Sequence, residues 1–288
     1  MVTGTAPAPV YRRFIDLPAG QTHYREAGRE RTGCLPLVLL HQASGSSRTM
    51  VPLMRRIGGE RPVIAPDLPG NGDSAPPETD SPAMADYARS VARMLDAAGL
   101  DEVAVYGFHA GACVAAELAV LRPGQVKAVI LDSMGLYDPA EAAAFADRYV
   151  PVIDKHKHGL HLIEAWNFVR DTYLFWPWFR TDADHARGVG LPPLEEMHDK
   201  VVEVIKSMQH FGAYYRAAFM HDKAAVLPQI GCPTLVTAGR DNSQAGHVPT
   251  IAAMIAGAES LITAGVYTPQ TAEATAGEYA RWLSRLDG

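Results

Sequence analysis

The sequence predicts an α/β fold in which a mainly parallel sheet is flanked by helices and interrupted by a helical insertion. Three observations predict this class. Short apolar runs alternate with longer stretches of helical periodicity, clusters of turn-forming residues follow the runs, and the alternation stops at residue 137 and resumes after residue 227. Alternating strands and helices are typical of βαβ units, whose strands run parallel. With 288 residues and 48% hydrophobic composition, the chain can bury a large core.

The predicted elements follow in chain order. An antiparallel hairpin opens the chain, at residues 10–16 and 21–26. A continuous apolar run bounded by polar or turn residues indicates a strand buried on both faces; 36–41 and 62–65 are such runs. Further strands are expected at 103–106, 127–131, 233–238 and 260–263. Helical periodicity predicts helices over 81–98, 110–121 and 272–285.

The insertion is rich in aromatic and histidine residues and contains no clear buried strand. We therefore predict a core domain formed by residues 1–136 and 228–288, and a helical cap formed by residues 137–227. The cap supplies three candidate substrate-binding side chains, Trp166, Arg170 and Trp176, which combine aromatic faces with a hydrogen-bonding group. A pocket lined in this way suits a small aromatic or carbonyl-bearing ligand.

Charge and cysteine usage exclude several classes of function. The net charge is −6 without a basic cluster, which argues against nucleic acid and membrane surfaces as partners. The three cysteines are far apart and fit no disulfide or zinc pattern. We expect a cytoplasmic protein with no leader segment, no bound metal and no cofactor, acting on a small molecule; a homodimer stays open.

The motif with the clearest chemistry is Gly107-Phe108-His109-Ala110-Gly111, placed between a predicted strand and a predicted helix. This context is that of a nucleophile elbow, in which a sharp turn presents its central side chain to the active site. Glycines two positions before and after it let the neighbouring strand and helix approach closely. The following helix directs its first N–H groups at the same place.

Three further segments appear in the order expected of one family. Residues 41–45 read His-Gln-Ala-Ser-Gly, residues 64–74 contain Asp-Leu-Pro-Gly-Asn-Gly-Asp-Ser, and residues 235–242 form an apolar strand followed by Gly-Arg-Asp-Asn. Together with the elbow, they resemble the α/β-hydrolase fold superfamily over nearly all of the chain outside the insertion. The resemblance implies an oxyanion hole formed by the N–H groups of Ala43 and Ala110, beside His41, Gln42 and Phe108 at the substrate.

The chain departs from that family where its catalytic triad belongs. His109 replaces the serine of the elbow, and Val266 stands where the family's final strand ends in histidine. The usual acid position is Asn242, although Asp241 precedes it directly. Because the serine mechanism needs a hydroxyl nucleophile, a base and an orienting acid, an ordinary acyl-serine mechanism does not fit.

His109 can still supply chemistry. Imidazole titrates near neutrality, with an ordinary pKa of about 6.5, so it can serve as a general base or a nucleophile. A helix N-terminus disfavours its charged form. We predict Asp241 and Asp132, which follows the next strand, as acidic partners.

Other histidines and acids have structural interpretations. His41 is a substrate-binding candidate in a motif where histidine is often structural. We expect Asp67 to order its turn, and His247 to lie at the start of a helix beside the site. The histidine cluster at residues 156–161 lacks nearby cysteine or paired carboxylates, so we interpret it as a solvated helix end.

The expected function is therefore a cofactor-independent α/β-hydrolase-fold enzyme that uses His109 instead of serine. It would act on a small carbonyl compound by hydrolysis or C–C bond cleavage. Two alternatives stay open: a catalytically inactive ligand-binding protein, and a cofactor-free lyase, decarboxylase or oxygenase. Fold alone does not decide among them.

Overall fold

The computed structural model describes residues 7–28, 33–266 and 269–287. An eight-stranded sheet runs through its centre in the order β1-β2-β4-β3-β5-β6-β7-β8. The strands are β1 (Val10–Leu17), β2 (Gly20–Ala27), β3 (Leu37–Leu40), β4 (Val63–Pro66), β5 (Val103–Phe108), β6 (Val126–Asp132), β7 (Thr234–Gly239) and β8 (Glu259–Thr263). The pairs β1–β2 and β2–β4 are antiparallel and all other pairs are parallel. The mainly parallel sheet and its opening hairpin are thus confirmed.

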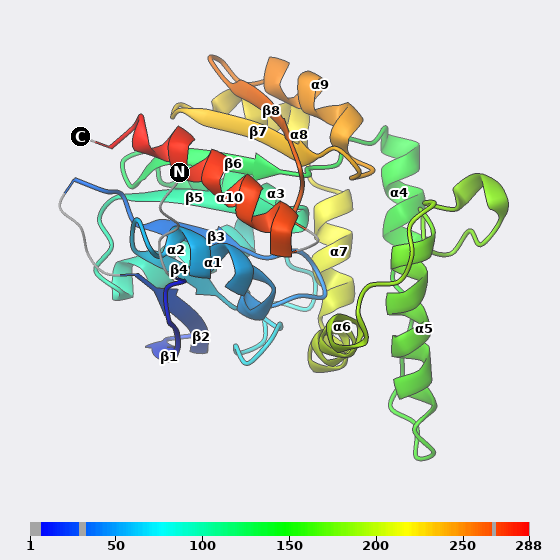
Figure 1. Cartoon of the computed structure of the whole chain (residues 1–288). Coiled ribbons are helices and arrows are strands. Elements are labelled where there is room, and N and C mark those ends of the chain that lie inside the picture. The colour runs from blue at the N-terminus through cyan, green and yellow to red at the C-terminus, as the bar shows by residue number, and fades with distance from the viewer. Residues whose placement is uncertain (1–6, 29–32, 267–268, 288) are drawn as a thin grey trace.

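Helices cover both faces of the sheet (Figure 1). They are α1 (Val51–Ile57) and α10 (Pro269–Ser284) on one face, and α2 (Met84–Ala97), α3 (Ala110–Leu121) and α9 (Val248–Ala253) on the other. Along the middle strands, successive side chains point to opposite faces of the sheet. Leu37 and Leu39 pack with α1 and α10, whereas Val38 and Leu40 pack with α2 and α3. Since every β3 side chain is buried, the apolar run is continuous, as the sequence predicts.

The helical segment lies between β6 and β7. It consists of α4 (Pro139–Arg148), α5 (Leu160–Leu174), α6 (Leu194–Ser207), α7 (Phe211–Phe219) and α8 (Lys223–Val226). Its helices α4 to α7 stand beside the sheet in Figure 1, with α7 nearest the core and α5 outermost, whereas α8 lies at the core beside β7. Two hydrophobic clusters of its own, one around Phe168 and Phe211 and one around Phe145 and Phe219, hold it together.

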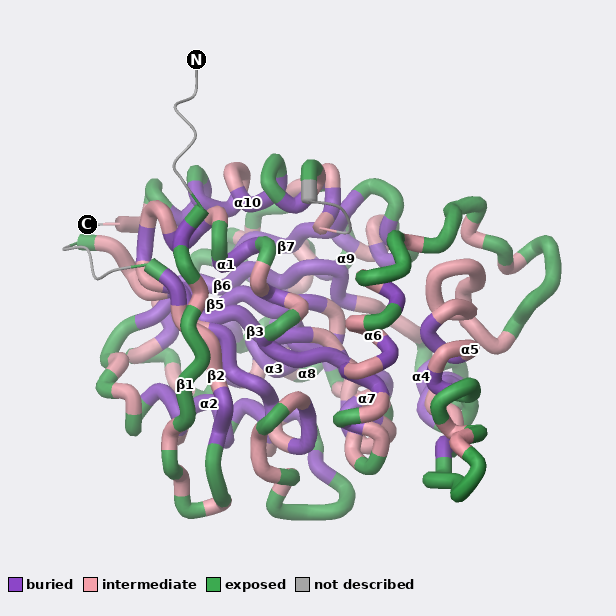
Figure 2. The backbone as a smooth tube through the Cα atoms, turned by 60° about the horizontal axis from the view of Figure 1, so that its bottom comes forward, coloured by how far each residue is buried: buried purple, intermediate pink, exposed green. Residues whose placement is uncertain are grey.

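Burial falls sharply from the sheet to the outer part of this segment. Figure 2 shows the central strands as buried and the loop between α5 and α6 as mostly exposed. Trp166 packs against the cluster around Phe168 and Phe211. The guanidinium Nε of Arg170 forms an ion pair with Oδ1 of Asp171 at 2.8 Å. Within the described residues, no helix is long and apolar enough to cross a membrane.

Candidate active site

The elbow at His109 is a sharp turn between β5 and α3. His109 has φ 50° and ψ −112°, a backbone conformation that side-chain-bearing residues rarely adopt. A Cβ on Gly107 would lie 2.2 Å from the carbonyl oxygen of Gly111, and one on Gly111 would lie 2.3 Å from that of Leu40. Both glycines are therefore required for the strand and helix to approach, as the motif predicts.

The side chain of Asn242 contacts the imidazole of His109. The amide Nδ2 of Asn242 lies 3.3 Å from Nε2 of His109. The orientation of this amide is fixed because its Oδ1 accepts a hydrogen bond from the backbone N–H of Gln244 at 2.8 Å. Since Nδ2 can only donate, Nε2 of His109 is the acceptor and the neutral ring carries its proton on Nδ1.

His109 is held in its neutral form. Burial, followed by the positive charges of Arg187 and Lys200, lowers its pKa from 6.5 to about 3. A carboxylate at the position of Asn242 would stabilise the imidazolium and so raise the pKa of His109, but the amide of Asn242 carries no charge. The ring is thus deprotonated throughout the physiological range, which keeps its lone pair available and makes it a weak base.

The predicted acid Asp241 does not occupy the position beside the ring. Asp241 is exposed, whereas Asn242 is buried and contacts His109. In the turn after β7, Arg240 and Asp241 are both exposed and Asn242 is the first buried residue, so the structure places the amide, rather than the neighbouring carboxylate, against the ring. Val266, in place of the family's histidine, is partly buried and packs against the core on the α1–α10 side of the sheet.

The second predicted acid, Asp132, is buried in a network of hydroxyl groups. Its carboxylate accepts hydrogen bonds from Tyr106 and Tyr279, both at 2.7 Å, and from Ser133 at 2.8 Å. Its backbone carbonyl accepts the N–H of His109 at 2.9 Å. Asp132 therefore supports the elbow through its main chain, and its carboxylate is engaged by tyrosines rather than by the imidazole.

Ala43 and Ala110, the predicted oxyanion-hole residues, line the same cavity as His109. Ala110 is the first residue of α3, where a helix leaves N–H groups without helical partners. Ser44 follows Ala43 with φ 53°, so the loop turns sharply at this point. The arrangement brings two main-chain segments to one wall of the cavity, beside the imidazole.

The cavity has a volume of about 200 Å³ and lies between the core and the helical segment. Aromatic rings from the helical segment form much of its wall, namely Tyr149, Phe168, Tyr173, Trp176, Tyr215 and Phe219. Three cationic side chains, Arg187, Lys200 and Lys223, also line it, and the described lining residues include no aspartate or glutamate. The cavity is consequently aromatic and electropositive.

Three of the six predicted substrate-binding residues line this cavity: Gln42, Phe108 and Trp176. The other three, His41, Trp166 and Arg170, do not line it, because other contacts hold them elsewhere. His41 is fully buried between backbone groups, with Nδ1 donating to the carbonyl of Gln42 at 2.7 Å and Nε2 accepting from the N–H of Leu68 at 2.9 Å. Trp166 and Arg170 belong to the packing and surface of α5 described above.

A second cavity of about 300 Å³ adjoins the first. The two share Gln42, Phe108 and Lys200 as lining residues, and Val266 lines the second one. Lys200 is placed between them, and burial lowers its pKa, an effect that Glu196 and Glu203 oppose. The sequence contained no signal for Lys200 or Arg187, since both lie on the insertion far from any motif. The sequence did contain a signal for Asn242, because this residue stands where the family usually has its catalytic acid.

The remaining candidates have structural roles. Asp67 accepts hydrogen bonds from His23 Nδ1 at 2.8 Å and from the N–H groups of Ser47 and Asp73 at 2.7 and 2.9 Å, which orders the turn as expected. His23, Asp67 and Asp73 are close enough for a metal, but these bonds already occupy the carboxylate of Asp67. Nδ1 of His247 accepts the N–H of Leu136 at 3.0 Å.

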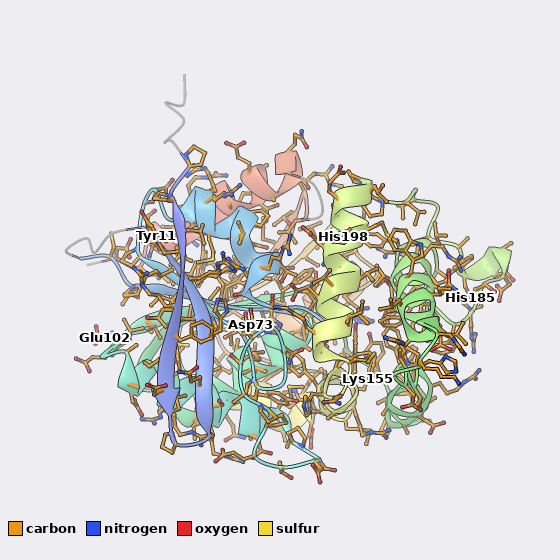
Figure 3. All side chains as sticks on the ribbon, turned by 90° about the horizontal axis from the view of Figure 1, so that it is seen from below. Tyr11, Asp73, Glu102, Lys155, His185 and His198 are labelled. Atoms are coloured by element: carbon orange, nitrogen blue, oxygen red, sulfur yellow. The ribbon has the colours of Figure 1, made fainter. Side chains whose placement is uncertain are left out.

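The histidine cluster of the insertion does not line the cavity. His156 and His158 are exposed, and the nearest labelled side chain in Figure 3, Lys155, lies on the helical segment, across the molecule from Tyr11. Local contacts engage these rings: Nδ1 of His156 accepts the N–H of His158 at 3.2 Å, and Nδ1 of His161 accepts the N–H of His156 at 3.0 Å.

Comparisons with known proteins agree with the geometry. A family model described as alpha/beta hydrolase fold matches residues 36–155. A proline iminopeptidase of Heyndrickxia coagulans is 32% identical over 127 residues, which cover 44% of each chain. The match therefore spans less than half the length of this curated relative.

Solved structures are similar over almost the whole chain. A thermophilic esterase from Thermogutta terrifontis superposes with a TM-score of 0.72 at 20% identity, covering 96% of this chain and 100% of that one. A hydrolase from Pseudomonas aeruginosa superposes with a TM-score of 0.69 at 21% identity, covering 94% and 98%. At this identity the likeness establishes the fold, and the chemistry must be argued from the site.

Proposed function

We propose that this chain, which has the α/β-hydrolase fold over nearly its whole length, is an enzyme of that superfamily that uses His109 where the family uses serine. Its substrate would be a small aromatic carbonyl compound that carries or develops a negative charge. The observation that carries this proposal is the neutral imidazole of His109, presented by the elbow to an aromatic, electropositive cavity.

The cations and the imidazole would act together. Burial is the largest cause of the low pKa of His109, followed by the positive charges of Arg187 and Lys200. An anionic ligand beside these two cations would offset their part of the effect. Binding would therefore raise the pKa of His109 toward the range in which imidazole is an effective general base. The enzyme would gain its base only when the substrate is present.

A sequence of events follows from this arrangement. The carbonyl oxygen would lie against the N–H groups of Ala43 and Ala110, each such donor being worth roughly 3–4 kcal/mol in well-studied hydrolases. Nε2 of His109 would exchange its long contact with Asn242 for a water molecule or a substrate proton. The outcome would be hydrolysis or C–C bond cleavage, and the helical segment would cap the cavity and exclude bulk water.

A second candidate function is ligand binding without turnover. It is favoured by the same low pKa of His109, together with Asn242 and Val266 in place of an acid and a base. In that case the cavity would bind the same anionic aromatic ligands and leave them unchanged.

The test is incubation with a panel of aromatic 2-oxo acids, their esters and aromatic 1,3-diketones, followed by mass spectrometry of the products. The enzyme hypothesis predicts turnover that falls by about 10²–10⁴-fold in His109→Ala, the usual contribution of a general base. His158→Ala, which changes an exposed histidine outside the cavity, is the matched control. Binding without product, or turnover that survives His109→Ala, would contradict the enzyme hypothesis.

A further inference from the structure

A second group of reactive side chains, of which Cys113 lines the cavity, plays no part in the chemistry proposed for His109. Cys113 lies on α3, one helical turn beyond the elbow, and its side chain contributes to the cavity wall. His221 follows α7, and its side chain is only 3% exposed. Nε2 of His221 lies 3.0 Å from Oε1 of Glu117, one helical turn further along α3. A cysteine and a glutamate on α3 and a histidine after α7 therefore lie together beside the cavity.

The ring of His221 is oriented by this contact. With Nε2 directed at Glu117, its other nitrogen, Nδ1, is buried and makes no hydrogen bond of ordinary geometry with any described residue. The thiol of Cys113 is close enough for the sulfur and the imidazole to change each other's pKa. This order of groups, from thiol to imidazole to carboxylate, is the one that activates a cysteine nucleophile.

The surrounding charges favour a thiolate. Burial raises the pKa of the Cys113 thiol, but the positive charges of Lys223 and His221 outweigh this and lower its pKa, against a small opposing effect of Glu117. For His221, burial lowers the pKa, but Cys113 and Glu117 raise it to about 9. The phenols of Tyr137 and Tyr214, the other titratable groups nearby, have pKa values raised by burial and stay neutral.

We propose that Cys113 is a nucleophilic site for α,β-unsaturated carbonyl compounds that enter the cavity, with His221 as its proton donor and Glu117 as a positioning residue. The thiolate sulfur forms a bond to the β-carbon of the ligand. The electron pair of the C=C bond moves to the α-carbon, which takes the proton from Nδ1 of His221. The step has no leaving group and needs no further reactant, and it is independent of His109.

The chemistry of the cavity agrees with this ligand class. A thiolate, rather than a thiol, is the reactive form of cysteine, and an electropositive surrounding favours it. Cys113 is only 2% exposed, so a ligand reaches it through the cavity that it lines. Lys223 lines the cavity with Cys113 and supplies that positive charge. The aromatic wall suits a flat conjugated ligand.

The test uses N-ethylmaleimide, itself an α,β-unsaturated carbonyl compound, at limiting concentration and short times. Peptide mass spectrometry then gives the modification rate of each of the three free cysteines, Cys34, Cys113 and Cys232. Between about pH 8 and about pH 6 an ordinary thiol loses roughly a hundredfold in rate, because its thiolate fraction falls. We expect Cys113 to be modified first at the lower pH and to lose much less of its rate than Cys232, whose pKa is raised by burial.

Two variants separate an activated thiol from one that is merely accessible. His221→Gln should slow the modification of Cys113 at about pH 6 by at least about tenfold, since each unit by which a thiol pKa rises costs tenfold in thiolate. Glu117→Gln should slow it less and should lower the pH at which His221 titrates. Cys232→Ser is the matched control and should leave Cys113 unaffected. An unreactive Cys113 in the wild-type protein, or a pH profile parallel to that of Cys34, would overturn the proposal even if His221→Gln failed to fold.

Discussion

Replacing His109 by asparagine gives a quantitative test of the environment of the elbow. Asparagine does not titrate near neutrality, and it tolerates positive φ better than most residues. The wild-type ring has a pKa of about 3 in the folded state against 6.5 for an ordinary histidine. Because the folded value is the lower one, the unfolded chain binds the proton first. The contribution of His109 is therefore present above about pH 6.5 and is lost as the pH falls toward about 3.

The magnitude follows from these two values. Each pH unit across this range costs about 1.4 kcal/mol of unfolding free energy, or up to about 5 kcal/mol in total. Between about pH 7.5 and about pH 5, the wild-type protein should lose about 2 kcal/mol more than His109→Asn. Other groups, such as the buried His41, titrate equally in both proteins and cancel in the comparison.

The assay is urea unfolding of both proteins at the two pH values, with His158→Asn as the control for removal of an exposed histidine. The control should follow the wild-type protein. Parallel loss of stability in the wild-type protein and His109→Asn would show that His109 titrates normally, and would refute the derivation of its neutral state.

Three other perturbations have definite expected outcomes. Asn242→Asp should place a carboxylate against His109 and raise the pKa of the imidazole by about 1–3 units. In urea unfolding, the loss of stability between the two pH values should then be closer to that of His109→Asn than the loss of the wild-type protein is; an unchanged loss would contradict the contact between residues 242 and 109. Lys200→Met should raise the pKa of His109 and weaken binding of an aromatic carboxylate by about tenfold in a calorimetric titration, whereas equal affinity would exclude Lys200 from the anion site. Asp67→Asn should lower the free energy of unfolding by about 2 kcal/mol at neutral pH. Burial raises the pKa of Asp67, but hydrogen bonds from His23, Ser47 and Asp73 lower it from 3.8 to about 2. This contribution is present above about pH 3.8 and is lost toward about pH 2, so a loss of stability that persists at the lowest pH would point to packing instead.

Much of the fold was predictable from local patterns. The strands buried on both faces have continuous apolar runs, and α3 begins and ends at the predicted residues, 110 and 121, because the elbow and a following turn bound it. The helix α1 was not predicted, because its seven residues, Val51–Ile57, are too few to show a helical period. The glycines of the elbow revealed the turn because only glycine allows the approach of Gly111 to Leu40.

The site was predictable only where a motif specifies it. His109, Ala43 and Ala110 follow from the resemblance, and the structure places all three on one cavity. Arg187 and Lys200, which set its charge, lie on the helical segment, where tertiary packing alone decides which side chains point inward. Asp241 and Asn242 differ by one residue, and the direction of a side chain in a turn depends on backbone angles that a single sequence does not specify.

The central claim is that the elbow holds a neutral imidazole whose basicity is restored by an anionic ligand. Nuclear magnetic resonance titration of His109 in ¹⁵N-histidine-labelled protein, assigned by the loss of its signals in His109→Asn, measures this directly. We expect a ring protonated only at Nδ1 at neutral pH, a pKa far below 6.5 in the free protein, and a higher pKa once an aromatic carboxylate is bound. A pKa at or above 6.5 in the free protein, or one that the ligand leaves unchanged, would contradict it.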